Sequence, residues 1–440
     1  MSFMKNPLLL KRFQLGLVHV AVAMTLVPIN STLNRVMINE LGLSATLVAV
    51  LASLPYFFAP MQVWIGSVSD RTMWFGFRRS PAILTGLLLC VLGVGVSPWA
   101  ATALASGNPY GWLAGLLPFF LWGMGYNFAS VSYLALATDL SGEDQRGGTI
   151  AVMWFMMIVG IIVTAISIGR MVENYSPAVL QHAFSTIALT SLGIGLVGLL
   201  GLEPRNKTGG EIANSQQPTP SQMWAAIAGN PQARAFFIYL TLLLAAILGQ
   251  DVLLEPFAAQ AFGWSVSQTT RLTSIWGTAV LFTILLATPL ERMLSRKVVA
   301  QIGNIGSLAG FVLLTWGGII ANSGTFYSGV VLLGCGTGLA TVSNLALMFD
   351  LTLPGQVGLY VGAWGFSNAL SRLTGSLLGG VLRDLATWLS GNNLFGYAVV
   401  FSIEAVLLAI SALLLTHIDV GAFKRSAAVP PVIERASLAD

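Results

Sequence analysis

Long apolar stretches follow one another along almost the whole chain. Each has about 20 residues or more, the length of helix that crosses the hydrocarbon core of a bilayer. They are continuously apolar, whereas the strands of a membrane β-barrel alternate with a period of two. The pattern therefore predicts twelve transmembrane helices, over residues 13–36, 43–66, 81–104, 111–138, 149–169, 183–202, 235–254, 272–290, 299–320, 326–349, 358–382 and 395–417.

The composition agrees with an all-α membrane protein. Of the 440 residues, 55% are hydrophobic and only 9% are charged, and the mean hydropathy is +0.78. These values are far more apolar than those of a soluble domain. The first apolar stretch is too long for a signal-peptide core and is followed by no convincing cleavage site, so we expect it to be retained as a helix.

Basic residues are distributed unevenly around the predicted helices. With twelve helices, both termini and the loops after even-numbered helices lie on one side, and that side carries 16 of the 21 Lys and Arg residues. The positive-inside rule predicts that this side, with both termini, is cytoplasmic. The net charge of +4 then reflects topology and not nucleic-acid binding. The other five basic residues are Arg35, Arg170, Arg271, Arg372 and Arg383.

The chain contains an internal repeat. Residues 123–140 align without gaps with residues 334–351 at an offset of 211, and ten of these eighteen positions are identical, including Gly, Ser and Asp. A duplicated six-helix unit explains this similarity. We therefore expect an N-terminal six-helix bundle over 1–203, a cytoplasmic linker over 204–232, a C-terminal six-helix bundle over 233–418 and a cytoplasmic tail over 419–440.

The loop after the second predicted helix, GSVSDRTMWFGFRRSP at 66–81, resembles the signature loop of the major facilitator superfamily. Its small and charged residues suit close helix packing and a charge lattice at the interface, although an ordinary positive-inside loop is the alternative. The equivalent loop of the second half has charged residues but no glycine-led pattern. We therefore expect the lattice of charged contacts to be lopsided, that is, different in the two halves. The residues of the signature loop are Gly66, Asp70, Arg71, Arg78 and Arg79.

Several further segments closely resemble the bacteriochlorophyll delivery family, also called the PucC type, a branch of the same superfamily. They are LNRVMINELGL at 33–43, FGFRRSP at 75–81, residues 249–277, LATDLSGEDQRG and GGVLRDL. The resemblance covers roughly residues 10–418 and implies the major facilitator fold, two pseudo-symmetric six-helix bundles.

That resemblance also implies a function in a photosynthetic membrane. This membrane would be the thylakoid membrane or the cytoplasmic or intracytoplasmic membrane. Members are implicated in assembling light-harvesting or photosystem polypeptides and in binding or delivering chlorophyll or bacteriochlorophyll within membrane lipid. Two alternatives remain open: a proton-coupled secondary transporter of a small solute, and a scaffold of an antenna complex that transports nothing.

A few ionisable residues lie within or at the ends of predicted helices, where they are costly. Asp251 and Glu255 are one helical turn apart, so we expect both carboxylates on one face. They are intramembrane or gate candidates together with Arg35 and Arg271, and the alternative is a structural ion pair of the acids with Arg271 or Arg35. Arg372 and Glu404 fall deep inside helices and are candidates of the same kind, for coupling, for binding or for an interhelical ion pair.

Chlorophyll has an open axial position on its Mg²⁺, which accepts an imidazole nitrogen or a side-chain amide oxygen. His19 is the one histidine deep in a predicted helix, so it is the candidate pigment ligand. A buried histidine hydrogen-bonded to a neighbouring helix is the alternative. Weaker candidates are Gln62, Asn127, Asn304, Asn344 and Asn368.

Sequence signatures of catalysis and of metal binding do not occur. There is no P-loop, G-x-S-x-G, HExxH or paired CxxC motif, and three histidines in the chain make a histidine-rich metal site improbable. Cys90 and Cys335 fall in apolar helices, where we expect them to pack as small apolar residues. The sequence therefore predicts that the protein is not an enzyme.

Overall fold

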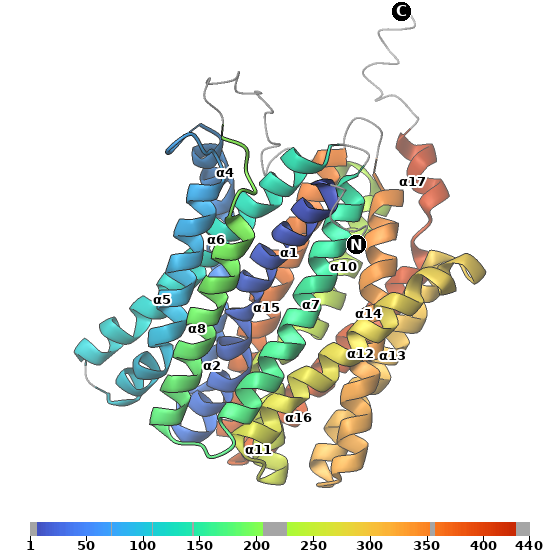
Figure 1. The fold of residues 1–440 in the computed structure, drawn as a ribbon. Coiled ribbons are helices and arrows are strands. Elements are labelled where there is room, and N and C mark those ends of the chain that lie inside the picture. Colours follow the sequence, from blue (N-terminus) through green and yellow to red (C-terminus); the bar gives the residue numbers. More distant parts are fainter. Residues whose placement is uncertain are drawn as a thin grey trace, which may run out of the picture.

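The computed structural model describes residues 7–427 except 72, 108, 143–144, 206–226 and 353–356. The described residues form a bundle of long helices that lie side by side (Figure 1). Within them, β structure is limited to one isolated bridge between Trp74 and Phe77. We call residues 7–205 the N half and residues 227–427 the C half; most of the predicted linker lies outside the described residues.

The N half contains six helical segments in chain order. They are α1–η2–η3 (Pro7–Met24, Pro28–Leu33, Val36–Glu40), α2–α3–η4–α4 (Ala45–Ala52, Leu54–Phe57, Ala59–Met61, Gln62–Arg71), α5 (Ser80–Ala105), α6 (Pro109–Ser141), α7 (Arg146–Met171) and α8 (Pro177–Leu199).

The C half repeats this arrangement. Its segments are α10–η5–α11 (Pro231–Gly249, Gln250–Val252, Leu254–Phe262), α12 (Val266–Met293), α13 (Arg296–Ile319), α14 (Ser323–Asp350), α15 (Val357–Ser390) and α16 (Asn393–His417), followed by the short α17 (Val420–Ala427).

The all-α membrane fold is confirmed. Among the described residues, nine helical stretches are long and apolar enough to cross a membrane. The segment α2–α4, α6 and α15 complete the predicted order of twelve. The seventh helix differs most from its predicted range, because it does not stop at 254 but continues after a break to Phe262.

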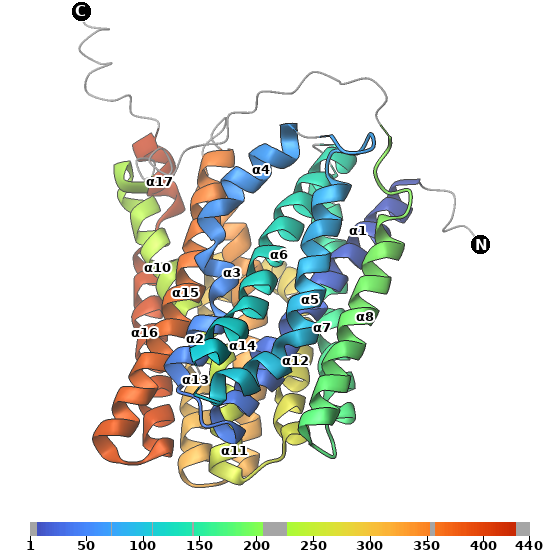
Figure 2. The same ribbon diagram turned by 90° about the vertical axis from the view of Figure 1, so that its left-hand side faces the viewer.

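Proline residues interrupt three of the segments. A proline ring lacks the N–H group and clashes with the carbonyl four residues earlier, so a helix tends to break there. The first segment leaves α-helical geometry after Met24, four residues before Pro28. The seventh breaks between Val252 and Leu254, just at the carbonyl that Pro256 would crowd. Figure 2 shows that α2, α3 and α4 likewise form one bent segment.

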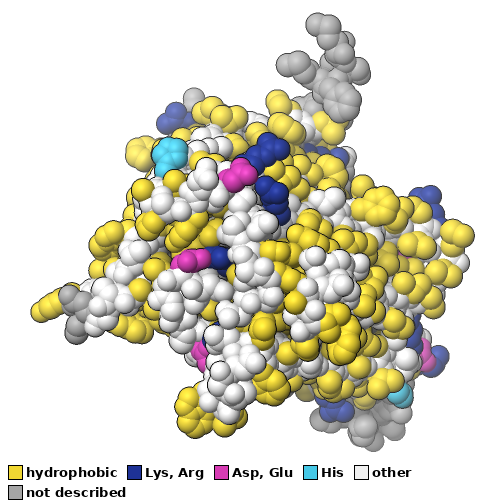
Figure 3. Space-filling view, turned by 90° about the horizontal axis from the view of Figure 1, so that it is seen from below, with side chains coloured by type: hydrophobic (Ala, Val, Ile, Leu, Met, Phe, Trp, Pro, Cys, Tyr) yellow, Lys and Arg dark blue, Asp and Glu magenta, His cyan; other side chains and the backbone are white. Residues whose placement is uncertain are grey.

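The two ends of the bundle differ in what they carry. α1 begins, and α17 lies, at the upper end in Figure 1, which we call the terminal end. η3 and α11 lie at the opposite end, which we call the distal end. Seen from the distal end, the surface is mostly hydrophobic or uncharged, with few charged side chains (Figure 3). The assignment of the terminal end to the cytoplasm stays a prediction.

Helix packing repeats between the halves in the way the sequence duplication predicts. In the N half, a Cβ atom at Gly86 of α5 would lie 2.4 Å from the backbone nitrogen of Ala129 in α6. In the C half, a Cβ atom at Gly303 of α13 would lie 2.6 Å from the backbone nitrogen of Ala340 in α14. Ala129 and Ala340 are equivalent positions of the repeat. The repeated small residues are therefore places where two helix backbones touch.

Candidate binding site between the two halves

The two halves are joined between the middle of the bundle and its distal end. The hydrogen bonds between described residues of the two halves lie in this region. Nearest the middle, the Arg372 guanidinium of α15 donates to the Tyr56 hydroxyl of α3 at 3.1 Å. The others toward the distal end are Ser31–Glu255, Ser31–Thr273, Thr32–Thr270, Arg35–Trp264, Asn39–Pro256 and the bonds of Ala45 and Thr46 to Asp384.

Arg372 is the centre of a charged cluster in mid-bundle. Its Nη1 lies 3.6 Å from the Asp251 carboxylate of η5, and its guanidinium carbon lies 5.2 Å from the centre of the Tyr56 ring. The ion pair and the cation–π contact hold the guanidinium between the halves. The Arg372 and Asp251 side chains each keep 29% of their surface exposed, so a bound molecule can reach them despite their depth.

A small cavity lies beside this cluster. Its volume is about 10 Å³, about the space of one water molecule. Three of the lining residues belong to the N half and five to the C half, so the cavity changes whenever the halves move. The lining residues are Asn30, Ala52, Tyr56, Leu248, Asp251, Val252, Arg372 and Ser376.

The exposed face of α15 continues from Arg372 toward the terminal end. Gly365 and Asn368 lie seven and four residues before Arg372, which places all three on one face of the helix. Both are exposed, and a Cβ atom at Gly365 would meet nothing within 4 Å. The cluster is therefore approached along this face from the terminal end.

Asp251 and Glu255 have different partners, and the helix breaks between them. Asp251 pairs with Arg372, whereas Glu255 accepts hydrogen bonds from Ser31 and Thr273. The expected ion pairs with Arg271 or Arg35 do not occur among the described residues.

The two arginines proposed as partners of those acids have other environments. Arg35 forms an ion pair with Glu40 and donates to the Trp264 carbonyl at 3.0 Å. Arg271 lies exposed in the second turn of α12.

Glu404 lies inside the C half, apart from the contacts that join the two halves. Its side chain in α16 is buried, and its Oε2 has no hydrogen-bond partner within the described part of the chain. Its Oε1 lies 2.7 Å from where a Cβ atom of Gly249 would be, so it packs against the end of α10. A buried carboxyl without a cation favours its neutral form over an unpaired charge.

The signature loop ties helix ends together within the N half. Gly66 is buried in α4, while the side chains of Asp70 and Arg71 lie outside the described residues. Arg79 forms an ion pair with Asp139 at the end of α6, at 3.3 Å.

The C half has an ion pair that matches Arg79–Asp139. In the C half, Arg296 at the start of α13 contacts Asp350 at the end of α14 at 2.7 Å. Asp350 is the repeat equivalent of Asp139. The sequence comparison did not show this similarity, because Arg79 precedes α5 whereas Arg296 is the first residue of α13, and the loops before these helices differ in pattern. Both pairs join helices of one half, so each stabilises its own bundle.

Glu203, which follows α8, completes the N-half loop. Its carboxylate accepts the backbone N–H groups of Arg78, Arg79 and Ser80 at 2.7–3.2 Å, where α5 begins. Partial burial raises the pKa of Glu203, but the hydrogen bonds from Ser80, Arg79 and Arg78 outweigh this and hold the pKa below its ordinary value. The acid thus caps the positive end of α5.

A family model described as PUCC protein matches residues 32–423. The chain belongs to the PucC protein family. It is 33% identical to the protein PucC of Rhodovulum sulfidophilum, over 84% of each chain, and 30% identical to that of Rhodobacter capsulatus, over 90% of each chain. A further relative, 27% identical over 96% of this chain and 98% of the other, is named bacteriochlorophyll synthase 44.5 kDa chain, from Rhodobacter capsulatus.

Solved structures confirm the major facilitator fold for this PucC family member. A crystal structure of the nucleoside transporter NupG superposes with a TM-score of 0.72 over 93% of this chain and 99% of the transporter. The identity is 16%, so the likeness concerns the fold alone. The Arg372 cluster lies between the two bundles of this fold.

The histidine candidate of this PucC family member lies in α1 of the N half. His19 in α1 is 6% exposed, and its Nδ1 is buried without a hydrogen-bond partner among the described residues. The ring centre lies 5.0 Å from that of Tyr133 and 5.9 Å from that of Trp154, which is half exposed on α7. Nδ1 is therefore the candidate ligand atom, while a backbone hydrogen bond with Met153 of α7 favours the alternative of a histidine bonded to a neighbouring helix.

The amide candidates are mostly used by structural hydrogen bonds. Gln62 donates to Asn127 at 2.7 Å, and Asn127 in turn donates to two backbone carbonyls. The Tyr239 hydroxyl donates to the Asn344 side-chain oxygen and accepts from the Asn304 amide nitrogen. Of these two asparagine side-chain oxygens, only that of Asn304 is buried without a hydrogen-bond partner among the described residues. Among the described residues, no three His, Cys, Asp or Glu gather as a group that could hold a metal ion.

Asp384 of α15 joins the halves at the distal end. Its carboxylate accepts the backbone N–H groups of Ala45 and Thr46, the first residues of α2, at 3.2 and 2.7 Å, and the Thr46 hydroxyl at 2.7 Å. A C-half acid therefore caps an N-half helix, an interaction that exists only while the distal end is closed.

We expect Asp384→Ala to weaken distal closure by about 1–2 kcal/mol, because the N–H groups of Ala45 and Thr46 lose their acceptor and α2 loses the negative charge at its N-terminus, although its N-cap Ser44 remains. The readout is the distance between spin labels on Asn174→Cys and Ser323→Cys, which are exposed at the distal ends of the two halves, with Cys90 and Cys335 replaced by alanine. A longer distance is expected. Asp350→Ala, which breaks an ion pair within the C half, is the control and should leave the distance unchanged.

Proposed function

We propose that this protein is a membrane-embedded assembly factor for light-harvesting or photosystem complexes, and that it binds or delivers chlorophyll or bacteriochlorophyll. The observation that carries the proposal is membership of the PucC family over nearly the whole chain. The name of one full-length relative, a bacteriochlorophyll synthase chain, supports a connection with pigment. The partners would be the antenna or photosystem polypeptides, reached through the lipid of a photosynthetic membrane, with both termini in the cytoplasm.

In this proposal the Arg372 cluster anchors the polar groups of the pigment. Chlorophylls carry keto and ester carbonyls at one edge of an apolar ring, and these oxygens accept hydrogen bonds from guanidinium and hydroxyl groups. Arg372 and Tyr56 are such donors, and they come from different halves. Relative movement of the halves would separate the two donors and release the pigment to an acceptor polypeptide.

The experiment that tests the function is purification from a pigmented host, followed by absorption spectroscopy. Pigment that copurifies in a fixed ratio, and is lost in Arg372→Ala, would support delivery. Antenna polypeptides that copurify without pigment would leave only a scaffold, and a protein that purifies with neither pigment nor antenna polypeptides would contradict the proposal.

A proton-coupled transporter of a small solute is the second candidate. It is favoured by the ion pair of Arg372 and Asp251, which is accessible between two bundles of a fold shared with a nucleoside transporter. Uptake of solute into pigment-free vesicles that contain the purified protein would establish it and would contradict pigment delivery.

For the magnesium of the pigment we propose His19 as the axial ligand, reached from the lipid side when Trp154 turns away. His19→Ala is then expected to lower the pigment content or to shift its long-wavelength absorption band, because the ligand sets the environment of the metal. His182→Ala, which removes an exposed histidine of α8, is the matched control. An unchanged pigment ratio and spectrum in His19→Ala would eliminate His19 as a ligand.

A further inference from the structure

A buried carboxyl lies where the halves meet at the distal end. Glu255, in the first turn of α11, is 2% exposed. Its Oε1 accepts hydrogen bonds from the Ser31 hydroxyl of the N half and, at 2.8 Å, from the Thr273 hydroxyl of α12. Those two hydroxyls are themselves 3.3 Å apart, and Thr270 lies 3.5 Å from the other carboxyl oxygen. Glu255 therefore connects the halves through a small group of hydroxyls.

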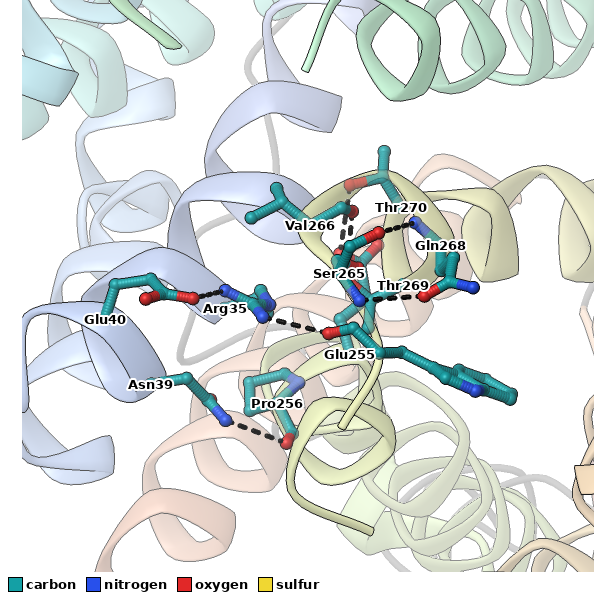
Figure 4. A network of polar contacts seen from close by, with 11 residues as sticks. Arg35, Asn39, Glu40, Glu255, Pro256, Ser265, Val266, Gln268, Thr269 and Thr270 are labelled. Carbon is teal, nitrogen blue, oxygen red and sulfur yellow. Dashed lines mark hydrogen bonds and ion pairs between the residues drawn. The ribbon is translucent and has the colours of Figure 1, made fainter. Parts of the chain in front are cut away.

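Neighbouring bonds follow the same line between the halves. Thr32 and Thr270 are linked by a hydrogen bond of 3.1 Å between their hydroxyls. Arg35 and Asn39 of the N half donate to backbone carbonyls of the C half, Arg35 to that of Trp264 and Asn39 to that of Pro256 (Figure 4). Closure of the distal end thus buries Glu255, and separation of the halves would expose it to water.

Glu255 has no cation of its own. Among the described residues, none forms an ion pair with it, and the nearby Arg35 is held by Glu40 and by the Trp264 carbonyl. Hydroxyl groups stabilise a carboxylate but do not neutralise it, and an uncompensated buried charge is costly. The same hydroxyls accept a hydrogen bond from a protonated carboxyl equally well.

We propose that Glu255 is a proton-binding site, and that the bound proton holds the distal end of the protein closed. The distal-closed state then binds one more proton than the distal-open state, in which Glu255 loses Ser31 and becomes hydrated. Acidic solution favours closure, and a rise in pH favours opening. This goes beyond the proposed function, because it assigns a driving force to the movement of the halves whatever the cargo.

The other titratable groups around α11 have partners or lie elsewhere. Arg35, which precedes η3, and Glu40 of η3 pair with each other. Asp251 of η5 pairs with Arg372. The basic residues of α13 are at the terminal end. Arg271 of α12 is exposed. On α16, Tyr397 lies beneath the Arg383 guanidinium, and Glu404 packs against α10 within the C half.

The test is a pH titration of the spin-label distance between Asn174→Cys and Ser323→Cys in the purified full-length protein. From about pH 5 to about pH 9 we expect the ratio of open to closed protein to rise, by at most about tenfold per pH unit, the limit for one linked proton. Glu255→Gln, which imitates the protonated acid, is expected to stay closed across the range. Ser31→Ala, which removes the N-half partner, is expected to open more at every pH.

Glu404→Gln is the matched control, because it neutralises another buried acid that contacts only the C half. It should titrate like the parent protein. A distance that does not change with pH in the parent protein, or a full response retained in Glu255→Gln, would overturn the proposal. The measurement needs no pigment and no antenna polypeptide, so its outcome is independent of whether the proposed assembly function is right.

Discussion

Arg372→Ala is expected to abolish pigment binding and to lower the free energy of unfolding by about 2–3 kcal/mol. Removing one partner of a buried ion pair typically costs about 3–5 kcal/mol, since the other charge stays behind without compensation. The Arg372 and Asp251 side chains keep 29% exposure, so water screens part of this loss and we expect the smaller figure. Thermal unfolding in detergent and the absorbance of copurified pigment measure the two effects.

The double variant Arg372→Ala, Asp251→Ala separates stability from binding. Without Asp251 no uncompensated carboxylate remains, so we expect much of the lost stability to return while pigment binding stays absent. Arg170→Ala, at the exposed end of α7, is the control for loss of an arginine as such. If Arg372→Ala retained its pigment, the cluster would be only a structural ion pair and the proposed anchor would be wrong.

The sequence predicted the helices and the repeat well, because both depend on long-range composition. A stretch of about 20 apolar residues has few alternatives to a membrane helix, and backbone-to-backbone contacts preserve small residues in a duplicated chain. The predicted helix ends are less accurate where a helix continues past an interruption. At Leu254 the chain resumes as α11, and only the structure shows that helix seven reaches Phe262.

The site was predicted only in part, and the reason is geometric. Charged residues inside apolar helices stand out in a sequence, so Arg372, Asp251 and Glu255 were found as candidates. Their partners were not, because a break in the helix turns Asp251 and Glu255 toward different helices.

The missed partners are residues of ordinary type. The only sequence signal of Tyr56 and Ser31 is their position near a proline. Asp384 looks like a normal interfacial acid beside Arg383. Pairs that join segments more than two hundred residues apart are not encoded in local pattern. A proline inside a predicted membrane helix is the one signal that could have located these positions, since the break it causes frees neighbouring polar groups for contacts between helices.

Gly125→Val and Gly336→Val are each expected to destabilise the protein by about 3 kcal/mol or more. A Cβ atom at Gly125 would lie 2.6 Å from the Cys90 backbone nitrogen, and one at Gly336 would lie 2.4 Å from that of Ser307. Backbone atoms cannot turn aside like a flexible side chain, so the two helices must separate and lose contacts along their whole length. Thermal unfolding monitored by size-exclusion chromatography measures the loss.

Because the two glycines are equivalent positions of the repeat, they test whether the halves have the same internal packing. We expect similar losses of stability from α5–α6 and from α13–α14, and a loss in the double variant close to their sum, since the sites share no partner. Gly193→Val is the control, because an added side chain there meets nothing within 4 Å. A large loss in only one of the two glycine variants would show that the duplicated helix pairs no longer contribute equally to the fold.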